Sequence, residues 1–179
     1  MDQLFAPWRI EWVERDEPNA EVDGCVFCTL ATGSNDREHR VVARSEHAYV
    51  LLNNYPYNPG HAMVIPTTHE GSIGGLDDEY LLAKERLLGR TIEAMDAALE
   101  PEGYNIGYNL GGAAAGGSIA DHLHAHVVPR WRGDTNFMPV IGDTKVIVEA
   151  IADTYDRLRE AFAAQDDATD QGEDAAVLL

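Results

Sequence analysis

The chain has 179 residues, enough for one domain of about 150 residues and a modest surplus, and 45% of them are apolar, which excludes a wholly disordered chain. Thirteen Lys and Arg against 31 Asp and Glu give a formal net charge of −18, which repels nucleic acids and anionic lipids. No apolar run approaches the roughly 20 residues that a membrane helix needs, and the first residues lack the layout of a signal peptide. We therefore expect a soluble, cytoplasmic protein that binds neither nucleic acid nor membrane.

The basic residues are almost all arginine, since Lys84 and Lys145 are the only lysines. An acid-rich, lysine-poor composition is typical of proteins that work in concentrated salt, where the Debye length falls to about 3 Å at 1 M and self-repulsion is screened. We interpret the chain as halophilic; the alternative is an acidic protein of ordinary salt conditions.

The elements follow from hydrophobic periodicity, taken here in chain order. Residues 1–23 form an N-terminal arm with alternating large apolar side chains, and the polar residues 31–40 are interpreted as a loop. Strands are predicted at 40–44, 48–52 and 61–65, a long helix at 77–100, strands at 104–109 and 122–128, and a second helix from about 145 to 162. Residues 165–179 are acidic and rich in small residues, which predicts a disordered tail.

Strands in consecutive pairs, with one helix between them and one after, indicate an α+β fold. We expect an antiparallel sheet with one long helix packed on it and a C-terminal helix. The folded domain would span residues 24–164.

Three histidines alternate with apolar residues in the predicted strand at 122–128. Alternate side chains of a strand point the same way, so His122, His124 and His126 share one face, and Leu123, Ala125 and Val127 share the other. Chance placement of three such histidines on a solvated face is a weak explanation. A single metal site is also a poor fit, because the outer two residues would lie about 13 Å apart, whereas ligands of one ion lie within about 4 Å. Different roles for the three histidines fit this spacing better than one shared metal ion.

The segment His-Leu-His-Ala-His-Val-Val resembles the signature of the histidine triad (HIT) superfamily, and the resemblance runs from Cys25 to about Lys145. The segments at 6–9, 55–61, 115–118 and 129–131 resemble its diadenosine tetraphosphate phosphorylase branch. The resemblance implies a HIT-like fold and a homodimer. It also implies that His124 is the nucleophile, attacking the α-phosphorus of a nucleotide to form a nucleotidyl-histidine, and that His126 contacts a phosphate oxygen and helps to protonate the leaving group.

Several other residues are candidate substrate contacts. The glycine-rich loop at 111–117 lets backbone N–H groups approach an anion, and Ser118 adds a hydroxyl, so Gly117 and Ser118 are candidate phosphate contacts. Other HIT branches carry a Gln in this loop, which is absent here. The resemblance implies that Asn109 contacts the α-phosphate or ribose and Asn53 the ribose. A polyphosphate must also find local positive charge, so we expect Arg130 to bind phosphate. Trp131 could stack on a base or pack in the core, and the resemblance to the phosphorylase branch favours contact with the base or substrate.

Cys25-Val26-Phe27-Cys28 contains the only two cysteines of the chain. A zinc half-site, a redox pair and two unremarkable thiols are the alternatives, and the βαβ pattern around a thioredoxin-like redox pair is absent. In zinc-bearing HIT proteins the other two ligands come from a Pro-x-x-His motif and the first triad histidine. The resemblance therefore implies a structural zinc ion held by Cys25, Cys28, His69 and His122.

These expectations combine into one function. The chain would cleave dinucleoside polyphosphates, with inorganic phosphate as the acceptor, so that diadenosine tetraphosphate gives ADP and ATP. The alternatives are a dinucleoside polyphosphate or nucleoside phosphoramidate hydrolase, and a zinc-stabilised nucleotide sensor without catalysis.

Overall fold

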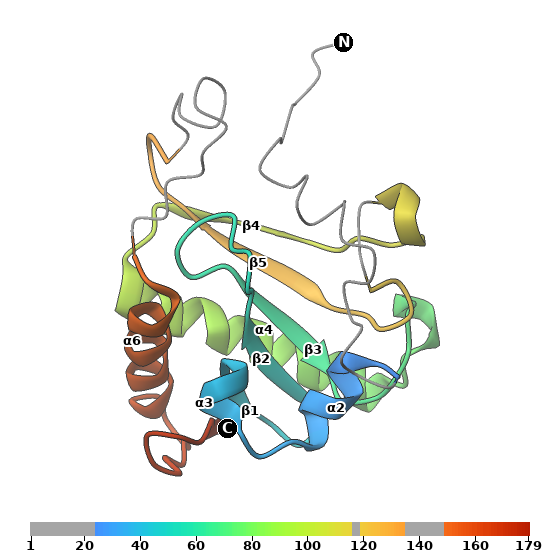
Figure 1. Ribbon diagram of the computed structural model, residues 1–179, viewed down its shortest axis with the longest axis horizontal. Helices are drawn as coiled ribbons and strands as arrows, with labels where there is room; N and C mark the ends of the chain where they lie inside the picture. Colours follow the sequence, from blue (N-terminus) through green and yellow to red (C-terminus); the bar gives the residue numbers. More distant parts are fainter. Residues whose placement is uncertain (1–23, 116–118, 135–148) are drawn as a thin grey trace.

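Six strands form one mixed sheet in the part of the chain that the structure, a computed structural model, describes: residues 24–115, 119–134 and 149–179 (Figure 1). The order across the sheet is β4-β5-β3-β2-β1-β6. The strands are β1 (Val41–Arg44), β2 (Ala48–Leu52), β3 (Ala62–Pro66), β4 (Gly103–Gly107), β5 (Ala125–Arg130) and β6 (Val177–Leu178). The predicted α+β class is confirmed, and the predicted antiparallel pairing holds at every junction except β1–β6, which is parallel.

Helices cover both faces of this sheet. The long helix α4 (Asp78–Leu99) and α6 (Ile151–Ala163) pack together on one face, and the short α2 (Val26–Thr32) lies on the other (Figure 1). The remaining helices are α3 (Asp36–His39) and two 3₁₀ turns, η2 (Ile73–Gly75) and η3 (Gly112–Ala115). The interpretation of residues 31–40 as a loop was wrong in part, because α2 reaches Thr32 and a turn of α3 follows.

Successive side chains along each strand point to opposite faces of the sheet, so the apolar core consists of two clusters. Val50 and Val64 face α4 and α6, where they meet Leu87 and Phe162. Their neighbours along β2 and β3 face α2 instead, in a second cluster that contains Tyr49, Leu51, Met63 and Ile65. In β5 the side chains of Ala125 and Val127 belong to the α4 side. The histidines that alternate with them therefore point toward α2.

The strand of the histidine segment is shorter than predicted, because β5 begins at Ala125 and not at His122. Val64 pairs with Ala125, so the same register would set Leu123 opposite Pro66, which has no N–H to donate. Leu123 N–H donates to the Glu70 carbonyl at 2.6 Å instead. His122 and His124 thus lie on the approach to the strand.

The C-terminal residues are not the disordered tail that their composition predicts. Val177 and Leu178 form β6 beside β1, and Ala176 and Val177 are at most 1% exposed. The Leu179 N–H donates to the Arg44 carbonyl at 2.9 Å. Burial of these small apolar residues and backbone pairing with β1 outweigh the local composition.

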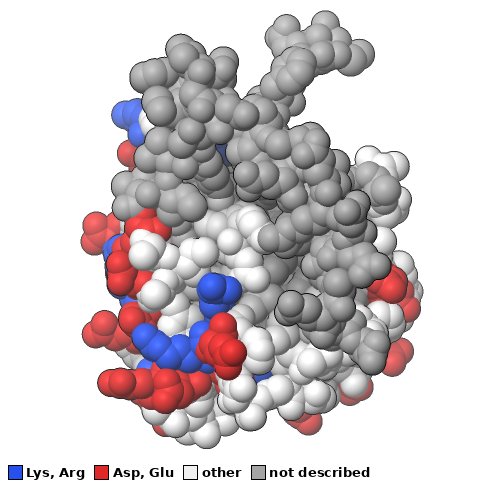
Figure 2. Space-filling model, in the orientation of Figure 1, with Lys and Arg blue, Asp and Glu red and all other residues white. Residues whose placement is uncertain are grey.

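Acidic residues outnumber basic ones by 31 to 13. Figure 2 shows Asp and Glu side chains gathered over α6, with a few Arg and Lys side chains among them. None of the helices in the described ranges is long and apolar enough to cross a membrane. The predicted N-terminal arm, residues 1–23, lies outside the described residues.

Candidate active site

The three histidines of the triad lie in a row beneath α2. The Phe27 ring of α2 packs against the rings of His122 and His124, with centroids 5.4 and 5.1 Å apart. The ring centroids of His124 and His126 are 5.0 Å apart. The predicted common face is therefore present, although only His126 belongs to β5 itself.

A backbone carbonyl holds the ring of His124. Its Nδ1 lies 2.9 Å from the carbonyl oxygen of His122, so Nδ1–H donates and the neutral ring keeps its lone pair on Nε2. The ring is 7% exposed. Burial lowers the pKa of His124, although the bond to the carbonyl opposes this shift. The neutral, nucleophilic form of the imidazole is favoured.

His126 lies at the meeting point of two loops. Its Nδ1 is 3.0 Å from Nε2 of the buried His61, and its Nε2 is 3.4 Å from the amide nitrogen of Asn109. His61 in turn accepts the N–H of Tyr57 on Nδ1 at 3.1 Å. An acceptor on Nδ1 sets the proton of neutral His61 on Nε2, which orients His126 by donating to it.

The two cysteines and two histidines expected as metal ligands come together at the other end of the row. The sulfur of Cys25 lies 3.3 Å from Nδ1 of His122, and the sulfur of Cys28 lies 3.3 Å from Nδ1 of His69 and 3.6 Å from Nδ1 of His122. All four ligand atoms lie within 4.8 Å of one another. Neighbouring ligands of a tetrahedral zinc ion are about 3.3–3.8 Å apart. The donor set and its spacing therefore fit a zinc ion.

The surroundings of the cluster orient its imidazoles. His122 Nε2–H donates to the Pro66 carbonyl at 2.9 Å, so Nδ1 faces the two sulfurs with its lone pair. Burial lowers the pKa of His122, which favours the neutral, ligating ring. Burial raises the pKa of the Cys28 thiol, and the neighbouring Cys25 raises it further. The Cys28 thiolate is thus disfavoured until a cation offsets its charge.

A glycine lets the two histidine-bearing segments approach each other. A Cβ atom at Gly71 would lie 2.9 Å from the Ala120 carbonyl oxygen and 3.0 Å from the Asp121 Cα. Backbone atoms cannot swing away as side chains do. Gly71 therefore permits the contact that brings His69 beside His122.

The structure brings only some of the predicted substrate residues to the histidines. Asn109 reaches His126, as described above. Asn53 directly follows β2, and its amide lies 3.7 Å from the sulfur of Met63, the residue opposite His126 in the sheet. Gly117 and Ser118 lie outside the described residues.

Arg130 and Trp131 are placed elsewhere. Arg130 is four residues along β5 from His126, about 13 Å, and its guanidinium binds both carboxylate oxygens of Asp134, at 2.6 and 2.9 Å. The indole N–H of Trp131 donates to the Glu100 carbonyl at 3.2 Å, and the ring packs against the α4 core. Neither side chain is brought to the triad.

Two contributors to the site were missed in the sequence. Phe27 covers His122 and His124, and the only signal was an apolar residue between the two cysteines. The Pro66 carbonyl orients His122 by accepting its Nε2–H. The signal in the sequence was the proline, which ends strand β3 and leaves its carbonyl available to a side chain. His61 also contacts His126 directly.

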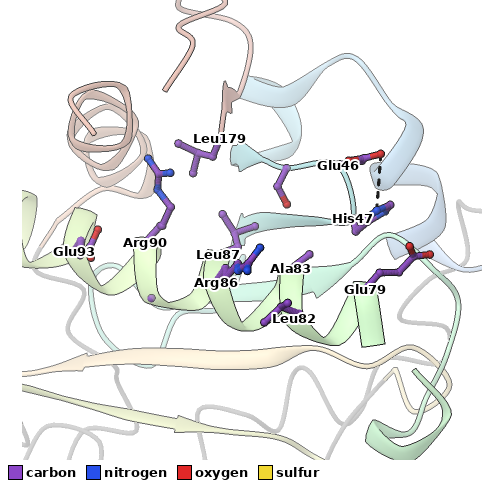
Figure 3. Close-up of a pocket in the computed structure, with 12 residues that line it drawn as sticks. Glu46, His47, Glu79, Leu82, Ala83, Arg86, Leu87, Arg90, Glu93 and Leu179 are labelled. Carbon is purple, nitrogen blue, oxygen red and sulfur yellow. Dashed lines mark ion pairs between the residues drawn. The ribbon is translucent and has the colours of Figure 1, made fainter. Parts of the chain in front are cut away.

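A separate cavity lies over α4. Its walls come from α4, the turn between β1 and β2, and Leu179, and none of the triad histidines lines it (Figure 3). Glu46 and His47 lie side by side at its edge, with 3.9 Å between carboxylate and imidazole.

Comparisons with known proteins find similarity in sequence and in fold. A family model described as HIT domain matches residues 34–133. A protein of Mycobacterium tuberculosis (strain ATCC 25618 / H37Rv) named AP-4-A phosphorylase is 39% identical over 170 residues, which cover 92% of this chain and 86% of that protein. A Zn-bound histidine triad family protein from Mycobacterium smegmatis shares the fold with a TM-score of 0.63 and 28% identity, covering 78% of this chain and 94% of that one. A HIT family member from Bacillus subtilis gives a TM-score of 0.55 at 29% identity, covering 73% of this chain and 85% of that one.

Proposed function

The chain belongs to the HIT domain family of nucleotide-binding proteins, and from this premise we propose that it is a nucleotidyltransferase acting on dinucleoside polyphosphates. Its substrate would be diadenosine tetraphosphate, with inorganic phosphate as the acceptor. The observation that carries the proposal is the 2.9 Å bond from His124 Nδ1 to the His122 carbonyl, which leaves the lone pair on Nε2. The name of the M. tuberculosis relative supports the choice of substrate.

The reaction proceeds by two displacements at phosphorus. His124 Nε2 attacks the α-phosphorus, the bond to the bridging oxygen breaks, and its electron pair leaves with ATP, so that adenylyl-histidine remains. An oxygen of inorganic phosphate then attacks the same phosphorus. The P–N bond breaks, its electron pair returns to Nε2, and ADP is released.

The neighbours of His124 position the phosphate. His126 and Asn109 would donate to the non-bridging oxygens, where negative charge increases in the transition state. Gly117 and Ser118 would supply a backbone and a hydroxyl donor, and Asn53 would contact the ribose. Arg130 and Trp131 remain predictions for substrate contact, which their bonds to Asp134 and Glu100 do not favour.

Product analysis tests this function. The purified chain is incubated with diadenosine tetraphosphate in high salt, with and without phosphate, and the nucleotides are separated by chromatography. ADP and ATP formed only with phosphate support phosphorolysis, whereas AMP and ATP without it indicate a hydrolase. Binding without turnover would indicate the sensor and refute the proposal.

Two histidine variants locate the nucleophile. His124→Ala removes the attacking nitrogen and is expected to lower turnover by at least about a thousandfold. The matched control is His47→Ala, at the edge of the cavity over α4, which should leave turnover unchanged. Turnover of His124→Ala within tenfold of the parent would contradict the assigned role.

We also propose that Cys25, Cys28, His69 and His122 hold a zinc ion. When bound, the ion supplies a structural cross-link and no reacting group, because all four of its positions are taken by protein. Metal analysis by mass spectrometry should find about one zinc per chain. Cys28→Ala should lose it, and His39→Ala, a histidine outside the cluster, should keep it.

We propose finally that the protein is a cytoplasmic homodimer. The support within the described residues is β4, an edge strand on which Ile106 is 44% exposed. Light scattering on the eluting protein should give twice the chain mass.

A further inference from the structure

The end of the chain is bound to both core clusters. Residues 174–179, here called the C-terminal strap, include β6 on the free side of β1. The side chain of Ala176 packs in the cluster that contains Phe27 and Leu30 of α2, and Val177 packs in the cluster under α4 and α6. The strap therefore contacts the layer to which α2 belongs.

A buried carboxylate joins the strap to an arginine. Asp36 is 7% exposed, and its Oδ2 accepts the Ala176 N–H at 2.9 Å. Its Oδ1 accepts from Arg44 Nη2 at 2.6 Å and from Nε at 3.1 Å. Both side chains of this ion pair are at most 15% exposed. One carboxylate thus fixes the strap and the direction of the guanidinium at once.

The other side of the same guanidinium faces the C-terminal end of α2. Arg44 donates to the carbonyls of Leu30 at 2.8 Å, Ala31 at 3.0 Å and Gly33 at 3.3 Å. Carbonyls at a helix end have no partner within the helix and carry partial negative charge. Since α2 has no basic residue in its own last turn, Arg44 supplies the missing cation.

The opposite end of α2 carries the functional groups. Cys25 precedes its first turn, Cys28 lies within it, and Phe27 covers the histidines. We propose that Asp36 and Arg44 are positioning residues, through which the C-terminal strap seats α2 over the triad and holds its cysteines in reach of His69 and His122. The effect on metal binding rests on the zinc site proposed above, whereas the seating of α2 does not.

Hydrogen exchange of the metal-free chain tests the seating of α2. Arg44→Gln and a chain shortened to Ala175 are compared with the parent by mass spectrometry, after circular dichroism has shown that each is folded. Amides of residues 26–32 should exchange about tenfold faster or more in both variants, with α4 unchanged. Arg157→Gln removes an ion pair with Glu149 and a hydrogen bond to the Ala98 carbonyl, both remote from α2, so it is the matched control and its α2 amides should exchange like those of the parent.

The zinc affinity tests whether the seating of α2 also holds the two cysteines in place for metal binding. Competition with a chromophoric chelator should show zinc bound about 10- to 100-fold more weakly by Arg44→Gln and by the shortened chain, and with parental affinity by Arg157→Gln. The proposal would be overturned if the α2 amides of these two variants exchanged at the parental rate. It would also be overturned if these amides exchanged faster while the zinc affinity stayed the same. If the parent binds no zinc, the metal site is refuted, and the exchange data still decide whether the strap seats α2. Should either variant not fold, Asp36→Asn replaces it, with the same expectations.

Discussion

The carboxylate of Asp134 joins the end of β5 to the loop that precedes His61. It accepts from Arg130 at 2.6 and 2.9 Å, from the Trp131 N–H at 3.2 Å and from the Asn58 amide at 2.8 Å. These donors, Arg130 first among them, lower the pKa of Asp134 from 3.8 to about 2. Replacing it by asparagine removes the charge and keeps the shape.

The pKa gives the size of the expected effect. At about 1.4 kcal/mol per pKa unit, the lowered pKa corresponds to about 2 kcal/mol of the free energy of unfolding. The carboxylate side chain is 10% exposed, but its main partner Arg130 is 39% exposed, so solvent screening leaves about 1 kcal/mol of this contribution. The sign follows from the direction: ionised Asp134 stabilises the fold fully above pH 3.8, and this stabilisation is lost as the pH falls toward 2.

Urea unfolding of the parent and Asp134→Asn, followed by circular dichroism in high salt, measures the difference. The variant should be less stable by about 1 kcal/mol at neutral pH, and the two unfolding curves should converge as the solution is acidified through this range. Asp166→Asn, an exposed carboxylate of the C-terminal region, is the control and should cost little at any pH. Equal stability at neutral pH, or a difference that does not change with pH, would refute the reasoning.

Three further predictions concern the core, a turn and the surface. Phe27→Ala should lower the free energy of unfolding by about 3 kcal/mol, measured with urea, because the ring is 3% exposed; a loss below 1 kcal/mol would be inconsistent with its packing. Gly60→Ala should cost about 1–3 kcal/mol in the same assay, since φ is +79° and the new Cβ would meet Leu99 at 2.4 Å; parental stability would speak against this. The thermal midpoint should rise with potassium chloride concentration, because salt screens a net charge of −18; a falling midpoint would argue against a halophilic protein.

Much of the fold was predictable because it depends on local periodicity. The helix at 77–100 and the strands at 40–52 have apolar side chains at the spacing that one buried face requires, and they appear in the structure within a residue or two. The alternation of His124 and His126 with Ala125 also predicted which residues face the core. Such patterns need no knowledge of distant contacts.

The errors arose where distant residues decide the structure. Asp36 lies 140 positions from Ala176, whose N–H it accepts, and composition alone could not connect them. The start of β5 depended on which residue lies opposite Leu123, and this requires the sheet register.

The pairing of β6 with β1 also bears on how copies of the chain can associate. An unpaired edge strand offers a row of N–H and C=O groups that another polypeptide can extend, a common route to aggregation. Two residues of β6 occupy part of this row, and so short a strand is a poor template for further growth. In the proposed dimer, association through the sheet would then use the β4 side, which is the other edge of the described sheet.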